Sequence, residues 1–357
     1  MSTRTLWYAV NKELVKKQVP VPTLDAGEVL VKVKAIAFNP TDYKHLDFGI
    51  AQNSGLGCDF SGDIAEVGSG VSLVKVGDSV SGMISGGNDE RPERGSFTDF
   101  VKVHETQVFK FNSLKIDGSK EIPAGAPTTY EQAASLGACL ATTAFAYESY
   151  NRWDTSKKNS QSGYALIYGG VSSLGFMAGQ VAKYLGFNVI AVASSKHKDL
   201  LKLVGITHVV DYHDEDWVEQ ARKIGGDDIV YAYDTISFAD TLSLVCKAVS
   251  TTKPVKINVS LPGTPEPENL GKNITIDAPL TYLMSDPYKI FGPRRIEGEP
   301  HFMKDAPTNI AHANKLLAEG VITALPVTVV GEGIDAIPAG INAIRKGVSG
   351  EKVVITL

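Results

Sequence analysis

The chain has 357 residues, of which 43% are hydrophobic and 21% charged, and its formal net charge is -5. This length exceeds the roughly 250–300 residues at which a single hydrophobic core stops growing, so two domains are expected. The acidic balance gives no basic surface for nucleic acid, and no apolar run reaches the roughly 18 residues that span a bilayer. We therefore expect a small-molecule partner and neither a nucleic-acid nor a membrane partner.

The cysteines and the beginning of the chain bear on its compartment. Cys58, Cys139 and Cys246 lie too far apart in sequence to form a CxxC pair or the disulfide framework of a small secreted protein. Residues 1–10 contain no basic segment followed by an apolar stretch, which a secretory signal would require. The sequence favours a cytoplasmic protein.

The first third of the chain has β character. Apolar and polar residues alternate from Glu28 to Ile36, and short β-rich pieces follow between glycines. A Pro/Ala/Gly-rich stretch at 123–127 then precedes a helical pattern at 130–136, so a domain boundary is expected near Pro127. Residues 1–127 are predicted to form a β-rich domain.

The following region, residues 128–303, alternates strands and helices. An apolar strand at Tyr164–Tyr168 leads through a glycine turn into a helix that Gly186 ends. Further strands are expected at 188–193, 208–210 and 229–233, with a helix at 196–204. This order predicts an α/β fold with a doubly wound parallel sheet of the Rossmann type, in which residues 263–303 show no clear period.

The last segment, residues 304–357, is expected to return to the β-rich domain. It contains a helical pattern at 306–318 and strands at 326–330 and 352–356.

The glycine turn at residues 169–175 is the first candidate binding site. A strand that ends in glycines at a helix start can bind a pyrophosphate, because free N–H groups and the helix dipole favour anions there. The dinucleotide-binding fingerprint has a glycine where this chain has Ser172, so the motif is imperfect. The alternative is a strand-to-helix turn that binds no ligand.

The end of the second strand decides between NADH and NADPH. An NAD site presents a carboxylate to the adenosine ribose about 20 residues after the glycines. This chain has Ser194 there, followed by Ser195, Lys196, His197 and Lys198, whose hydroxyls and cations suit a 2′-phosphate. NADPH is the expected cofactor, unless these are only solvated residues at a helix start.

Several motifs spread along the whole chain carry a family resemblance. They are Asn39-Pro40-Thr41-Asp42-Tyr43-Lys44, Gly57-Cys58-Asp59-Phe60-Ser61-Gly62, Val76-Gly77-Asp78, Gly95-Ser96-Phe97, Glu131-Gln132-Ala133-Ala134, Asp211-Tyr212 and Ser349-Gly350-Glu351-Lys352. With them the chain resembles the zinc-independent, quinone oxidoreductase-like branch of the medium-chain dehydrogenase/reductase family. It is similar there to fungal trans-acting enoyl reductases and yeast NADPH-dependent aldehyde reductases.

The resemblance implies a GroES-like catalytic domain joined to the Rossmann domain, and it implies roles for individual residues. Gly170, Val171, Ser172, Ser173 and Leu174 would hold the pyrophosphate, and Ser194, His197 and Lys198 would face the adenosine phosphate. Tyr212 would line the adenine side, Leu261 would touch the nicotinamide half, and Lys44, Val348 and Ser349 would reach the cofactor from the other domain.

The metal positions of the family's zinc enzymes are changed in this chain. By resemblance, Asn39 stands at the first cysteine position, Cys58 and Asp59 at the histidine and glutamate positions, and Cys139 near a third ligand position. The histidines show no pair at metal spacing. No metal is expected, although two thiols and a carboxylate leave altered metal binding open.

The expected reaction is NADPH-dependent hydride transfer to activated C=C bonds or quinones. Without a Lewis acid, catalysis depends on positioning the nicotinamide against an electrophilic carbon and on hydrogen-bond donors for the developing charge. Tyr43 and Lys44 are the candidate catalytic donors, but Tyr43 could equally form a wall of the pocket. An aldehyde reductase and an NADPH-binding redox sensor without turnover remain as alternatives, and monomer or homodimer stays open.

Overall fold

The computed structural model describes residues 2–291 and 294–357 and divides them into two compact units. The β-rich unit comprises Met1–Ala141, Tyr282–Ala318 and Ala324–Leu357, and the parallel-sheet unit comprises Thr142–Thr281 and Glu319–Thr323. The sequence placed the boundaries near Pro127 and at residue 303. The observed boundaries lie elsewhere for two reasons. The helix after Pro127 packs against the strands of the β-rich unit, and the segment after Thr281 contacts that unit through the hydroxyl of Tyr282.

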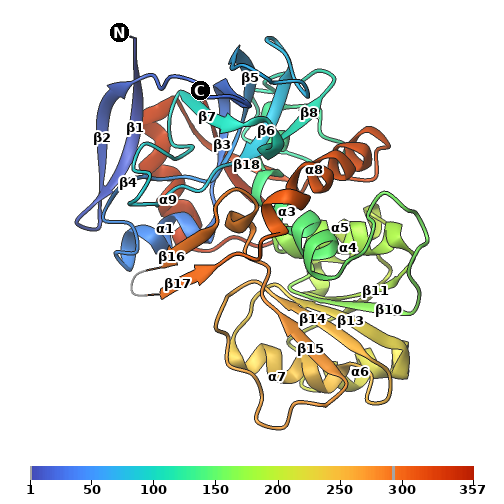
Figure 1. The fold of residues 1–357 in the computed structure, drawn as a ribbon. Helices are drawn as coiled ribbons and strands as arrows, with labels where there is room; N and C mark the ends of the chain where they lie inside the picture. Colours follow the sequence, from blue (N-terminus) through green and yellow to red (C-terminus); the bar gives the residue numbers. More distant parts are fainter. Residues whose placement is uncertain (1, 292–293) are drawn as a thin grey trace. The chain divides into compact units, whose positions relative to one another are not determined.

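Two sheets build the β-rich unit (Figure 1). One has three strands in the order β2-β1-β4, and the other has the order β8-β6-β5-β3-β19-β18-β9, with β7 also paired to β3. The closing strand β19 runs antiparallel to β3, so the C-terminal segment completes the sheet begun by the N-terminal segment. The strands are β1 Thr3–Val10, β2 Glu13–Pro20, β3 Glu28–Ala37, β4 Asn53–Gly55, β5 Asp59–Val67, β6 Ser79–Met83, β7 Phe100–His104, β8 Val108–Phe111, β9 Glu121–Ile122, β18 Val327–Glu332 and β19 Lys352–Thr356.

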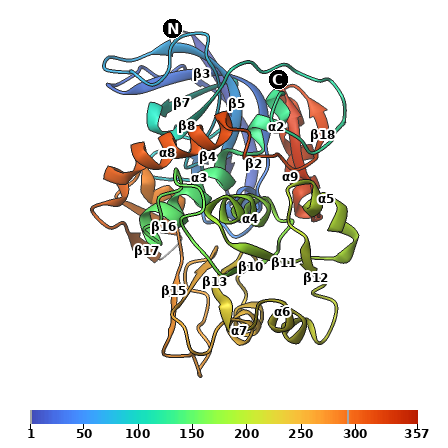
Figure 2. The ribbon, with the colours of Figure 1, turned by 90° about the vertical axis from the view of Figure 1, so that its right-hand side faces the viewer.

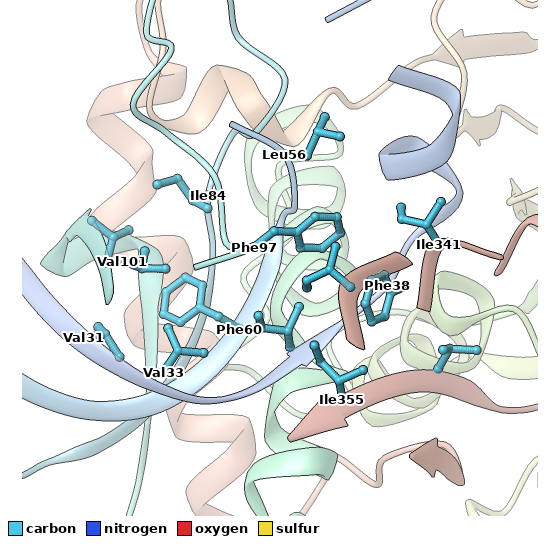
Figure 3. Packing of buried hydrophobic residues seen from close by; sticks show 14 of the residues in the cluster. Val31, Val33, Phe38, Leu56, Phe60, Ile84, Phe97, Val101, Ile341 and Ile355 are labelled. Atoms are coloured by element: carbon cyan, nitrogen blue, oxygen red, sulfur yellow. The ribbon is translucent and has the colours of Figure 1, made fainter. Parts of the chain in front are cut away.

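The alternation in β3 explains the core of this unit. Side chains at alternate positions of a strand face the same side of its sheet, and here that side is filled by Val29, Val31 and Val33. Figure 3 shows Val31 and Val33 near the ring of Phe60, with the rings of Phe97 and Phe38 further along the same cluster. Burying large apolar side chains of this kind contributes roughly 1.5–3 kcal/mol each before the loss of conformational entropy is counted.

Further helices and an antiparallel pair of strands complete the β-rich unit. Helix α1 packs against α9, and β16 pairs antiparallel with β17. The bounds are α1 Pro40–Asp47, η1 Glu105–Gln107, α2 Tyr130–Ala134, α3 Gly137–Phe145, η5 Thr281–Met284, β16 Tyr288–Phe291, β17 Arg294–Glu297, α8 Phe302–Ala318, η6 Ile334–Ala336 and α9 Ile337–Arg345. The unit boundaries at Ala141 and Tyr282 fall within α3 and η5.

The parallel-sheet unit has six strands in the order β12-β11-β10-β13-β14-β15. This is the doubly wound dinucleotide-binding order, with the reversal between β10 and β13. Helices α4 and α5 lie on one face of the sheet and α6 and α7 on the other (Figure 2). The bounds are η2 Ala146–Tyr150, β10 Tyr164–Tyr168, α4 Ser173–Leu185, β11 Asn188–Val192, η3 Ser195–His197, α5 Lys198–Leu203, β12 His208–Val210, α6 Trp217–Gly225, η4 Gly226–Asp228, β13 Ile229–Asp234, α7 Ala239–Ala248, β14 Val255–Val259 and β15 Ile274–Asp277.

The predicted α/β fold is confirmed, but the region without a clear period contains more regular structure than its sequence indicated. Strand β15 adds a sixth strand to the parallel sheet, and β16 and β17 form a hairpin. Their four-residue length is too short for a periodicity to emerge. In the described part of the chain, no helix is long and apolar enough to cross a membrane.

Candidate active site

Four of the predicted cofactor segments lie at one edge of the parallel sheet. The glycine turn follows β10, the Ser194 loop follows β11, Tyr212 follows β12 and Leu261 follows β14. Because these strands run parallel, their carboxyl ends meet at the same edge. The structure therefore brings these residues together, at the edge where doubly wound sheets bind nucleotides.

The glycine turn packs its backbone closely at the start of α4. A Cβ on Gly175 would lie 2.2 Å from the carbonyl oxygen of Gly169, so only glycine fits the helix start there. Gly170 and Val171 are buried in the turn. The first N–H groups of a helix have no intrahelical partner, so the N–H groups of Ser173 and Leu174 are the donors that this turn offers to an anion.

Ser172 shapes the turn through its hydroxyl group and its backbone N–H. Its Oγ accepts a hydrogen bond from the Gly175 N–H at 2.9 Å, and its own N–H donates to the Gly169 carbonyl at 2.8 Å. The Thr235 hydroxyl donates to the Tyr168 carbonyl, so it accepts the Ser172 proton across 2.8 Å. The serine that replaces the fingerprint glycine thus acts as the N-cap of α4.

The Ser194 loop carries three basic side chains. Lys196 and Lys198 are exposed, while Ser194 and His197 are partly buried. Burial, with a smaller effect of Lys196, lowers the pKa of His197. The permanent charges available to an anion here are therefore those of the two lysines.

One carboxylate also borders this loop. Asp211 accepts a hydrogen bond from the Ser195 N–H at 2.7 Å and from the N–H of His213 at 3.0 Å. These bonds lower the pKa of Asp211, so it stays ionised. Its oxygens hold the backbone of the loop rather than pointing out as free acceptors.

The two predicted apolar contacts of the cofactor stand exposed at the same edge. Tyr212 is 45% exposed and its ring lies 4.1 Å from the ring of His213, and Leu261 is 37% exposed. Exposed aromatic and apolar side chains of this kind can pack against the flat faces of a nucleotide.

The remaining predicted site residues lie in the β-rich unit. Tyr43 and Lys44 are on α1, and Val348 and Ser349 follow α9. The two helices pack together, and the Arg345 guanidinium binds the Asp47 carboxylate at 2.7 and 2.9 Å. Tyr43 and Val348 pack against the hydrophobic core, whereas Lys44 is half-buried.

A buried lysine lies among the positions that resemble metal ligands. The Lys352 ammonium donates to the Asn39 amide oxygen at 2.6 Å and to the Asp59 carboxylate at 3.1 Å. Asp59 also accepts from the Asn39 amide and from the Ala138 N–H. The Asp59 carboxylate and the Asn39 amide oxygen thus accept hydrogen bonds from donors of the protein itself.

The two cysteines of this region are held as thiols. Cys139 donates to the carbonyls of Ser135 and Leu136, and burial raises its pKa to about 12. Burial, reinforced by the charges of Asp42 and Asp59, raises the pKa of Cys58 well above its ordinary value. Metals bind the thiolate, which both environments disfavour.

Sequence reasoning missed Tyr282, Lys289 and Lys352 as residues of this region. Tyr282 lies 3.2 Å from the Thr41 hydroxyl, and Lys289 lies 4.7 Å from the centre of the Tyr282 ring. Both come from the segment without a period, which offered no signal. Lys352 belongs to the motif Ser349-Gly350-Glu351-Lys352, but the sequence alone did not show its hydrogen-bond partners.

Comparison with known proteins agrees with this architecture. Residues 25–113 match the "Alcohol dehydrogenase GroES-like domain" family and residues 173–272 match the "Zinc-binding dehydrogenase" family. The "Uncharacterized protein YNL134C" of Saccharomyces cerevisiae is 33% identical over 97% of this chain and 96% of its own length. The "Trans-enoyl reductase milB" of Cordyceps militaris is 30% identical over 96% of this chain and 94% of its own length.

Solved structures show the same fold. An alcohol dehydrogenase superfamily protein from Novosphingobium aromaticivorans superposes with a TM-score of 0.76 at 22% identity over 100% of both chains. CurK enoyl reductase superposes with a TM-score of 0.73 at 16% identity over 99% of both chains. The chain therefore belongs to the medium-chain dehydrogenase/reductase family, whose members are oxidoreductases that use a nicotinamide cofactor.

Proposed function

We propose that the protein is an NADPH-dependent reductase that transfers hydride to activated C=C bonds or quinones. One observation carries the proposal: the free donors of the glycine turn and the cations of the Ser194 loop lie at the same edge of the parallel sheet. The similarity to trans-enoyl reductases over nearly the whole chain supports the choice of activated alkenes.

The residues at the sheet edge fit the parts of NADPH. The N–H groups of Ser173 and Leu174 would bind the pyrophosphate, and Gly170, Val171 and Ser172 would shape the turn around it. Ser194, His197 and Lys198 would face the 2′-phosphate, and Tyr212 would cover the adenine. Position 194 carries no carboxylate to bind a free ribose hydroxyl, which favours NADPH over NADH.

The β-rich unit would supply the other contacts. Lys44 would donate a hydrogen bond to the cofactor, with Val348 and Ser349 beside it. Leu261, which belongs to the parallel-sheet unit, would lie against the nicotinamide half. The bound cofactor supplies the hydride. The chain's own residues hold the acceptor carbon in reach of it and keep water away, which is the larger part of such catalysis.

We infer that the reaction does not use zinc, although one matching family is described as zinc-binding. Asn39 and Asp59 are occupied by the Lys352 ammonium. The thiols of Cys58 and Cys139 are kept protonated by burial, so the donor set does not fit a zinc ion. All three cysteines are free, which supports a cytoplasmic location.

A screen of NADPH oxidation with quinones, enones, enals and saturated aldehydes tests the proposal. Product analysis with cinnamaldehyde distinguishes the reactions: saturated aldehyde is expected, whereas unsaturated alcohol would identify an aldehyde reductase. NADPH binding without turnover on any acceptor would identify a redox sensor. Full activity after exhaustive chelation is expected, and one equivalent of zinc with chelator-sensitive turnover would overturn the zinc-independent reaction.

A further inference from the structure

Three distant segments of the β-rich unit meet at the hydroxyl of Tyr282. The Tyr282 Oη lies 3.2 Å from the Thr41 Oγ1 and 3.7 Å from the Cys58 Sγ. Thr41 is on α1, Cys58 precedes β5, and Tyr282 is in the short η5 turn. Two of these segments belong to the motifs that carry the family resemblance.

The hydroxyl pair joins a buried side chain to a partly exposed one. Tyr282 is 7% exposed, while Thr41 is partly exposed. The contact to Thr41 is long for a hydrogen bond between hydroxyls, whose ordinary length is about 2.7–2.8 Å, and the thiol of Cys58 is a weak hydrogen-bonding partner. The phenol has a single proton, so it can leave these weak partners for a stronger acceptor such as a carbonyl oxygen.

The surroundings of Tyr282 favour a neutral donor beside a positive charge. Burial raises the pKa of Tyr282, which keeps its proton in place. The Lys289 Nζ lies 4.7 Å from the centre of the Tyr282 ring and donates to the Ser85 hydroxyl at 3.1 Å. Over residues 2–291 and 294–357, no carboxylate oxygen lies within ion-pairing distance of this ammonium. Burial lowers the pKa of Lys289, while the more distant charges of Asp286 and Asp89 favour its protonated form, and that protonated form would stabilise negative charge that develops nearby.

We propose that Tyr282 is the catalytic hydrogen-bond donor to the carbonyl oxygen of the substrate, with Thr41 and Lys289 as its positioning residues. This inference rests on the proposed reduction of activated alkenes. Hydride forms the new C–H bond at the β-carbon, the C=C electron pair shifts to make the enolate, and the Tyr282 O–H donates to the enolate oxygen. The α-carbon then takes a proton from water, and hydroxide leaves to solvent.

The test compares Tyr282→Phe with the matched control Tyr130→Phe. Tyr130 is 8% exposed, lies in the same unit and donates its hydroxyl proton to Asp63 at 2.6 Å. Removing one donor to a developing oxyanion costs on the order of 100-fold in kcat. Tyr282→Phe should show that loss with an unchanged Kd for NADPH, measured by nucleotide fluorescence, and Tyr130→Phe should retain wild-type kcat.

A spectroscopic readout is independent of turnover. Cinnamaldehyde bound with NADP⁺ cannot be reduced, and a hydrogen bond to its carbonyl shifts its absorbance to longer wavelength than in an aprotic solvent. The shift should occur in the wild type and in Tyr130→Phe and vanish in Tyr282→Phe. The wild-type spectrum needs no variant to fold, so absence of the shift there would already overturn the proposal.

Failures of the two proposals are distinguishable. An active wild type with an equally active Tyr282→Phe overturns the role of Tyr282 and leaves the reductase intact. A wild type that reduces none of the acceptors overturns the reductase and this inference with it.

Discussion

The ammonium of Lys352 lies 3.1 Å from the carboxylate of Asp59, and the two side chains are 4% and 0% exposed. Lys352 begins the last strand, so this ion pair joins the C-terminal segment to β5. Burial alone would lower the pKa of Lys352, but the charge of Asp59, its hydrogen bond to the lysine and the smaller effects of other neighbouring acidic groups together outweigh burial, and the net shift is upward. The lysine is therefore held as a cation among the positions that, by resemblance, correspond to the metal ligands of the family's zinc enzymes.

Replacing Lys352 with methionine should destabilise the fold strongly. The variant leaves the Asp59 charge buried without its partner, and breaking a buried pair in this way costs roughly 3–5 kcal/mol. Urea unfolding measures the loss. Lys16→Met is the control, because the Lys16–Asp335 pair is 44% and 72% exposed and such pairs contribute about 0–1 kcal/mol. Equal losses in both variants would contradict the role of the buried pair.

Replacing Lys198 with alanine should reduce the preference for NADPH. A charged hydrogen bond contributes roughly 1.5–3 kcal/mol, so the Kd for NADPH should rise about tenfold or more while the Kd for NADH stays constant. Lys202→Ala removes the same charge from an exposed position one turn further along α5 and should leave both constants unchanged. Equal use of both cofactors by the wild type would remove the Ser194 loop from the phosphate site.

Replacing Lys44 with alanine should raise the KM for NADPH and lower kcat. The cation would be lost from the cofactor, and the nicotinamide would be held less well. The melting temperature should barely change, since Lys44 is only half-buried. If steady-state kinetics with varied NADPH match the wild type, Lys44 is simply a solvated lysine on α1.

Asp42 should make the stability depend on pH. Burial raises its pKa from 3.8 to about 7, so between these values the folded state keeps a proton that the unfolded state has released. The stability that Asp42 contributes is therefore fully present below pH 3.8 and is lost as the pH rises to about 7. Buried His45, whose pKa falls from 6.5 to about 3, acts in the opposite sense and contributes stability that is lost as the pH falls.

The Asp42→Asn variant separates these effects. The amide can still accept from the Asn39 N–H but carries no charge to bury, so the variant should gain on the order of 4 kcal/mol over the wild type at pH 8 and almost nothing at pH 4. Urea unfolding at the two pH values measures this. Asp240→Asn, at an exposed position, should show no such difference. A gain that is equal at both pH values would show that Asp42 is ionised in the folded state throughout.

The elements that the sequence predicted well are those in which local and long-range signals agree. The helix that begins at Ser173 has apolar residues at helical spacing, and Gly186 ends it with φ 109°. The apolar runs of β10 and β13 are buried on both faces, as expected of parallel strands. The edge of the sheet where the cofactor segments meet follows from this topology alone.

The parts that the sequence did not reveal depend on contacts between distant residues. Strand β15 and the hairpin of β16 and β17 are too short to show a period, and their pairing partners determine them. Lys289 looks like an ordinary surface lysine in sequence. In the structure it is only 1% exposed, and its ammonium lies against the ring of Tyr282. Its burial depends on aromatic side chains that folding brings together from η5 and β16.

The most direct test of the account follows deuterium from the cofactor to the product. Purified protein is incubated with NADPH deuterated at the reactive C4 position and with cinnamaldehyde, and the product is analysed by mass spectrometry. The account predicts saturated aldehyde with one deuterium at the β-carbon, at one product per NADPH oxidised, in protein treated with chelator. Absence of deuterium from the product, or binding of NADPH without any product, would contradict it.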